Sequence, residues 1–71
     1  MVIIINGREV IEEKEFLTYQ DIVKACNLDL ERKPVVTYRD KKLDKSGELL
    51  RNHAIRLSNG LILNASCPDN A

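Results

Sequence analysis

Val2-Ile3-Ile4-Ile5-Asn6-Gly7 is the stretch that decides how this chain folds. Its first four residues are β-branched and apolar on both faces of a pleat, which is typical of a strand with neighbours on either side in a sheet. The Asn6-Gly7 pair tolerates the positive φ angles of a two-residue hairpin turn. We therefore predict a central strand over Val2–Ile5 and an antiparallel return strand over residues 8–13.

The predicted turn also determines which residues of the two strands lie opposite one another. Opposed residues share a face of the sheet, and a slip of one residue would exchange the faces. With a two-residue turn the predicted pairs are Ile5 with Arg8, Ile4 with Glu9, Ile3 with Val10 and Val2 with Ile11.

A short helix is predicted after this hairpin. Thr18 can cap a helix that begins at Tyr19, and Asp21 stands where its side chain can return the hydrogen bond to the cap. Asn27 suits the left-handed conformation in which many helices end. A helix of about two turns is not stable alone, so we expect it to pack on a sheet.

The second half of the chain is predicted to complete the sheet. Pro34 precedes a strand over residues 35–39, which are rich in β-branched and aromatic side chains. Residues 40–48 are charged and contain a glycine, which predicts a solvated loop. A second Asn-Gly pair, Asn59-Gly60, separates residues 54–58 from 61–66 and predicts a second hairpin.

This order of elements predicts an α+β fold. We expect a β-grasp (ubiquitin-like) roll, in which one helix packs across a mixed sheet of about four to five strands. A ferredoxin-like repeat would need a second helix, and the competing SH3-like barrel has no place for the capped helix. Because 71 residues form one domain, we assign residues 1–66 to it and residues 67–71 to a tail.

Charge and cysteine content narrow the classes of function. Lys plus Arg and Asp plus Glu each number 11, so the chain lacks the net positive field that attracts nucleic acid or anionic membranes. The longest apolar run, Val2–Ile5, is far too short to span a membrane, and no export signal precedes it. We expect a cytoplasmic protein with reduced thiols, no nucleic-acid partner and no membrane partner.

Candidate catalytic and metal-binding residues are few. His53 is the only histidine, and acid–base catalysis would need a second group within hydrogen-bond reach, so we interpret it as a solvated loop residue. Cys26 is on the helix face that should meet the sheet, where a thiol packs as a small apolar group, and Cys67 is in the tail. Their spacing does not fit zinc or iron–sulfur ligation. We predict no enzymatic activity, no metal and no cofactor.

Several short pieces spread from Ile3 to Asn64 carry a family resemblance. They are Ile3-x-Ile5-Asn6-Gly7, Leu17-Thr18-Tyr19, Val36-Thr37-Tyr38-Arg39, Ser46-Gly47 with Leu49, and Gly60-x-x-x-Asn64. In this order and spacing they resemble the bacterial ubiquitin-like domains of the multiubiquitin type. The resemblance implies a cytoplasmic protein modifier. It also implies target proteins and, as further partners, activating, conjugating and deconjugating enzymes encoded nearby.

Two regions are candidate sites under this hypothesis. The tail, centred on Asn70 and Ala71, would be processed, activated and joined to a target. Periodicity alone does not say which face of the first hairpin meets the helix. If Ile3, Ile5 and Val10 face the helix, as the resemblance suggests, an apolar patch is left on the open face. Such patches tend to mark interaction sites, and this one would comprise Val2, Ile4, Ile11 and Ile62.

Two other functions remain open. One is a β-grasp interaction module that is never conjugated, whose tail is inert and whose sheet patch binds partners. The other is a sulfur-carrier-like protein, although the chain ends in Asn70-Ala71 and not in the Gly-Gly that such carriers need. The tail separates the first two hypotheses, because a conjugated modifier needs a free C-terminus and an adaptor does not.

Overall fold

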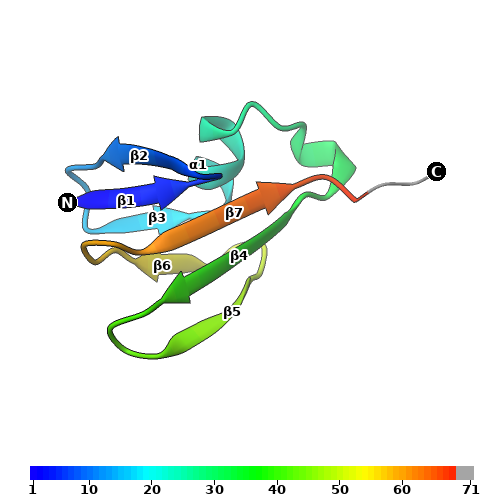
Figure 1. The fold of residues 1–71 in the computed structure, drawn as a ribbon. Coiled ribbons are helices and arrows are strands. Elements are labelled where there is room, and N and C mark those ends of the chain that lie inside the picture. Colours follow the sequence, from blue (N-terminus) through cyan, green and yellow to red (C-terminus); the bar gives the residue numbers. More distant parts are fainter. Residues whose placement is uncertain (69–71) are drawn as a thin grey trace.

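The computed structural model describes residues 1–68, so the predicted conjugation residues Asn70 and Ala71 lie outside the described part. The described chain forms seven strands, one α-helix and one short 3₁₀ helix, drawn in Figure 1. In chain order they are β1 (Val2–Ile5), β2 (Arg8–Ile11), β3 (Phe16–Thr18), α1 (Tyr19–Ala25), η1 (Leu30–Arg32), β4 (Val35–Asp40), β5 (Lys45–Leu49), β6 (Ala54–Arg56) and β7 (Ile62–Ser66).

Five of the strands form one mixed sheet in the order β2-β1-β7-β4-β5. Strands β1 and β7 run parallel, and the other neighbours run antiparallel. The two remaining strands, β3 and β6, pair with each other in a small second sheet. Helix α1 packs across one face, in contact with β3 and β4. The predicted α+β class, with one helix across a mixed sheet, is confirmed.

The first hairpin has the predicted register. Val2 lies opposite Ile11, and Ile5 lies opposite Arg8. The turn residues Asn6 and Gly7 have φ angles of 49° and 81°, the left-handed conformation that a two-residue turn of this kind requires. Strand β1 is flanked by β2 and β7, as its all-apolar sequence predicted.

The helix begins where the capping pattern placed it. The Asp21 backbone N–H donates to Thr18 Oγ1, and the Thr18 backbone N–H donates to the Asp21 carboxylate, each over 3.0 Å. The helix closes at Cys26, and Asn27 follows with a φ of 55°. The capping box and the left-handed residue that ends the helix are therefore both confirmed.

The prediction of a loop over residues 40–48 is wrong for residues 45–48. Residues Lys45–Leu49 form β5, which pairs antiparallel with β4 at the margin of the sheet. All of Lys45–Glu48 are nevertheless exposed. A marginal strand commonly carries charged side chains because only one of its edges is paired, and such a charged stretch predicts a loop when only the sequence is considered.

The predicted second hairpin is also wrong. Strand β6 pairs with β3, whereas β7 pairs with β1 and β4 in the other sheet. The Asn59-Gly60 turn does form, but it carries the chain from one sheet to the other. Its contacts are with β1: Val2 N–H donates to Asn59 Oδ1 over 3.0 Å, and Gly60 N–H donates to the Val2 carbonyl over 2.8 Å. Leu57 and Leu61, on either side of the turn, are both buried.

The hydrophobic core lies between α1 and the five-stranded sheet. Its fully buried side chains come from β1, α1, β4, the turn before β7 and β7 itself. Cys26 is half-buried against this cluster, in agreement with its interpretation as a small apolar residue. The largest fully buried side chains are Ile3, Ile22, Val23, Val36, Leu61 and Leu63.

Candidate functional site

The hairpin register decides which side chains the open face of the sheet presents. Ile3 and Ile5 are buried on the helix side, where Val10 packs against the core. The alternate residues therefore point away from α1. We call Val2, Ile4, Ile11 and Ile62 the open-face patch; Ile11 is 81% exposed, Val2 is 41% exposed, and the other two are half-buried.

The open-face patch has charged neighbours on both sides. Ile4 lies opposite Ile62 on the parallel neighbour β7. Across the other edge of Ile4 is Glu9, and across the other edge of Ile62 is Arg39. The row across the sheet thus has an apolar centre between an acid and a base. A partner with one apolar side chain and complementary charges would fit it.

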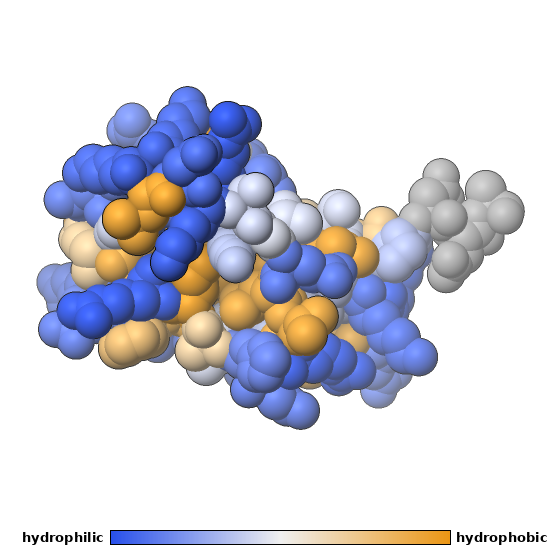
Figure 2. Space-filling model, turned by 90° about the horizontal axis from the view of Figure 1, so that it is seen from below, coloured by the Kyte–Doolittle hydropathy of each residue, from blue (hydrophilic) through white to orange (hydrophobic). Residues whose placement is uncertain are grey.

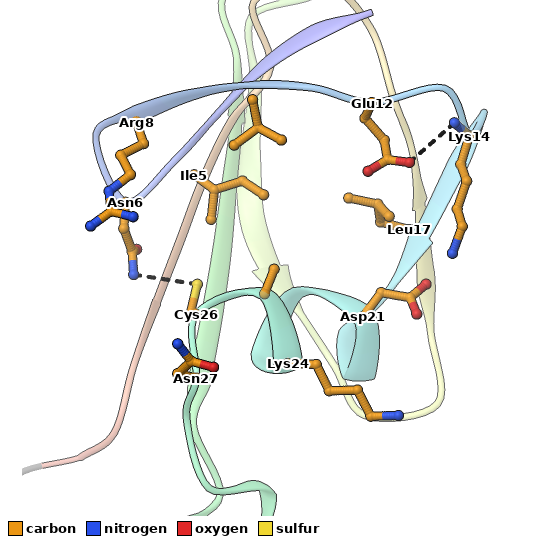
Figure 3. Close-up of a pocket in the computed structure, with 12 residues that line it drawn as sticks. Ile5, Asn6, Arg8, Glu12, Lys14, Leu17, Asp21, Lys24, Cys26 and Asn27 are labelled. Atoms are coloured by element: carbon orange, nitrogen blue, oxygen red, sulfur yellow. Dashed lines mark hydrogen bonds between the residues drawn. The ribbon is translucent and has the colours of Figure 1, made fainter.

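A second surface feature is a groove between the first hairpin and α1, shown in Figure 3. Its volume is about 680 Å³, and it is partly open to solvent. The apolar part of its lining comes from Ile5, Val10, Leu17 and Ala25. Charged side chains surround this part on both the hairpin and the helix: Arg8, Glu12, Lys14, Asp21 and Lys24.

The two carboxylates of this groove are already engaged by the backbone. Glu12 Oε1 accepts the Lys14 backbone N–H over 3.3 Å. The Thr18 backbone N–H lowers the pKa of Asp21, and the positive charges of Lys14 and Lys24 lower it further. Sequence reasoning missed this groove, because it depends on how far α1 stands from β2.

Cys26 closes one end of the groove without the features of a reactive thiol. Its Sγ accepts a hydrogen bond from Asn6 Nδ2 over 3.4 Å. Burial raises the pKa of the Cys26 thiol, so less thiolate is present at neutral pH than for a free cysteine. We therefore interpret Cys26 as a packing residue.

A hollow of about 620 Å³ lies on the side of the molecule seen in Figure 2, between the β4–β5 hairpin and β6. Figure 2 shows apolar side chains gathered near the middle of this face with charged ones around them. The sequence did not indicate this hollow, because it predicts a loop over most of β5 and pairs β6 with the last strand. Its apolar lining comprises Tyr38, Leu43, Leu49, Ile55 and Leu61.

The chain leaves the sheet at the end of β7, where Asn6 holds it. Asn6 Oδ1 accepts the Ala65 N–H over 2.8 Å, and Asn6 Nδ2 donates to the Ala65 carbonyl over 3.0 Å. The open-face patch reaches β7 at Ile62, four residues before Ser66, which at about 3.3 Å per residue is roughly 13 Å away along the strand. The patch and the exit of the tail therefore lie at opposite ends of one strand.

The remaining candidate residues do not gather into a site. His53 is exposed, and its carbonyl accepts the Tyr19 N–H over 3.0 Å, next to the Thr18–Ala54 pair of the small sheet. Cys67 is half-buried just after β7. Residues 1–68 contain no group of three or more His, Cys, Asp and Glu side chains placed to hold one metal ion. In the same range no helix is long and apolar enough to cross a membrane.

Comparison with known proteins gave no match. No family model matches the chain, and neither a curated protein nor a solved structure matches it significantly.

Proposed function

We propose that this chain is a cytoplasmic β-grasp (ubiquitin-like) protein modifier whose C-terminal tail is processed, activated and conjugated to target proteins. The observation that carries the proposal is the position of β7. It pairs with both β1 and β4, and the chain continues directly from its end into residues 67 and 68 (Figure 1). A segment that enzymes must handle thus starts from a firmly held strand.

The pair of hydrogen bonds between the Asn6 side chain and Ala65, which we call the Asn6 clamp, supports the same function. These two hydrogen bonds hold the end of β7 against the turn of the first hairpin. An enzyme that grips the domain would therefore find the start of the tail in a fixed place, and fixed geometry reduces the entropic cost of binding.

The open-face patch is proposed as the surface to which partner proteins bind. Those partners would be the activating, conjugating and deconjugating enzymes and the targets. Because the patch meets β7 at its other end, an enzyme could hold the patch while the tail stays free. The protein would act by being bound and attached, and it would catalyse no reaction itself.

Intact-mass analysis tests the proposal. The protein is recovered, with and without a C-terminal tag, from cells that also express its neighbouring genes. Adducts of higher mass that form only when the C-terminus is free are expected. Only the unmodified mass, in cells where those enzymes are active, would contradict conjugation.

The second candidate is a β-grasp interaction module that is not conjugated. The exposure of Val2 and Ile11 in the open-face patch favours it, because the patch needs no tail to bind a partner. This function predicts unmodified mass in both samples together with patch-dependent binding. A sulfur-carrier-like role ranks third, since no Gly-Gly pair occurs anywhere in residues 1–71.

A further inference from the structure

Strand β2 lies at the margin of the five-stranded sheet and pairs only with β1 (Figure 1). The Met1 amino group donates to the Glu12 carbonyl over 2.7 Å, and Glu12 N–H donates to the Met1 carbonyl over 2.8 Å. Bonded and non-bonded pairs alternate along an antiparallel ladder. Arg8 and Val10 therefore also turn their backbone groups toward β1, whereas Glu9 and Ile11 turn theirs outward.

The outward backbone groups of Glu9 and Ile11 form a short row of donors and acceptors with the spacing of a β-ladder. Another extended strand could pair with them. All of β2 is exposed or half-exposed, so no other element of the described chain covers this edge. We propose that the occupant is β2 of a second copy of this chain, paired antiparallel about a two-fold axis.

The charges on β2 select one register for this pairing. Only outward-facing residues can form the bonded pairs, which leaves registers that differ by two residues. Centring the axis on Glu9 would place two Glu9 side chains opposite each other, and centring it on Ile11 would oppose Glu9 and Glu13. Centring it on Val10 instead places Arg8 opposite Glu12 of the second copy, and it does so twice.

The faces on which the β2 side chains lie also fit the register centred on Val10. Arg8, Val10 and Glu12 all line the groove beside α1, so they lie on one face and meet their counterparts there. On the other face, Glu9 comes to lie beside Ile11 of the second copy. Opposite charges facing each other across strands are stabilising, and like charges are destabilising. With a formal net charge of zero, two copies have no long-range repulsion to overcome.

The pairing would join two open-face patches into one surface. The axis stands perpendicular to the sheet, so both helices lie on the same side and both open faces lie on the other. Ile11, the most exposed large apolar side chain, is next to the new interface. Two four-residue strands bury little area, so we expect a dimer with a Kd on the order of 100 μM.

Charge reversal with complementation tests the register. In Arg8→Glu alone and in Glu12→Arg alone, residues 8 and 12 of the two copies carry the same charge at both places where they face each other. Sedimentation equilibrium should therefore show dimerisation weakened by about tenfold or more. An equimolar mixture of the two variants restores opposite charges at every position and should recover the dimer. Lys41→Glu, on the turn beyond β4, makes the same change in net charge and should dimerise like the wild type.

Mixing Arg8→Glu with Glu48→Arg controls for general attraction between oppositely charged variants. Because Glu48 is on β5, at the other margin of the sheet, Glu48→Arg should dimerise with itself like the wild type, and its presence should not restore Arg8→Glu to the dimer as Glu12→Arg does. Circular dichroism confirms that each variant is folded. A wild-type chain that stays monomeric at about 1 mM would overturn the proposal and leave the edge to a different partner. A wild-type dimer that neither variant weakens, or that the mixture fails to restore, would overturn it as well.

Hydrogen exchange gives an independent reading at the edge itself. On concentration, the amides of Glu9 and Ile11 should become protected, while the Val10 amide is already protected by β1. Glu9→Pro removes an outward donor without removing a bond to β1, so it should abolish the dimer and leave the fold intact. Glu9 and Ile11 amides that exchange equally fast at low and high concentration would contradict the pairing.

Discussion

The ring of Tyr38 lies directly over the backbone of Gly47, its partner across the β4–β5 ladder. A Cβ atom added at Gly47 would stand 2.9 Å from Tyr38 Oη and 3.2 Å from Cζ. A Cβ atom at this position would therefore press on the end of the Tyr38 ring. The φ of Gly47 lies outside the left-handed region, so the constraint is one of space and not of backbone conformation. The contact gives β5 a packing partner despite its charged sequence, and Tyr38 also lines the hollow beside β6.

Replacing this glycine should destabilise the fold through Tyr38. Gly47→Ala forces the ring aside, and we expect the free energy of unfolding to fall by about 1–2 kcal/mol in urea titration. Tyr38→Phe removes the nearest atom, so the double variant should recover about 0.5–1 kcal/mol of that loss. Strictly additive effects would show that the two residues do not interact.

The clamp between Asn6 and Ala65 gives a second prediction. Asn6→Gly keeps the left-handed turn but leaves the partly buried N–H and carbonyl of Ala65 without the Asn6 side chain as their partner. The free energy of unfolding should fall by about 1–3 kcal/mol, and the Ala65 amide should exchange faster with solvent. Asn59→Gly removes a side-chain bond at the other end of β1 and should leave Ala65 exchange unchanged. Equal exchange at Ala65 in both variants would refute the clamp.

The helix cap should make stability depend on pH. Hydrogen bonding from the Thr18 backbone N–H lowers the pKa of Asp21 in the folded chain. Its contribution is therefore fully present above the unfolded pKa of about 3.9 and is lost as the pH falls through the lower folded value. In Asp21→Asn, the urea midpoint should change less between pH 6 and pH 3 than in the wild type.

A residual pH dependence is expected in that variant. The pKa of Asp40 is also lowered, chiefly by the Leu43 backbone N–H and also by the Ser58 hydroxyl, and it acts in the same direction. Removing both carboxylates with Asp21→Asn and Asp40→Asn should reduce further the change of the urea midpoint between pH 6 and pH 3. An Asp21→Asn profile that is parallel to the wild type would show that the cap carries no titrating charge.

The open-face patch gives the fourth prediction. Ile4→Asp places a charge at its centre and should reduce conjugate yield in cells by about tenfold if partners read this surface. Thr37→Asp introduces the same group on the same sheet face, outside the patch, and should leave the yield unchanged. Circular dichroism must show that both variants are folded. Equal conjugate yields from the two would exclude the patch as the surface to which partners bind.

Local signals in the sequence predicted the first half of the fold well. The Asn6-Gly7 turn determined the register of β1 and β2, and Thr18 with Asp21 determined where α1 begins, because each involves residues close together in the chain. The mistakes came from residues whose partners are distant. Residues 45–48 were predicted as part of a loop, although they pair with β4, and Ala54–Arg56 was predicted to pair with the last strand, although it pairs with β3.

The candidate surfaces divide in the same way. The sequence alone established the alternation that places Val2, Ile4 and Ile11 on one face, because side chains alternate along a strand whatever surrounds it. Only the tertiary structure decided that this face is open, by placing α1 on the other. It also decided that β2 has a free edge, that a groove separates β2 from α1, and that Asn6 holds Ala65. These features join residues far apart in the chain, and no local pattern encodes the distance between them.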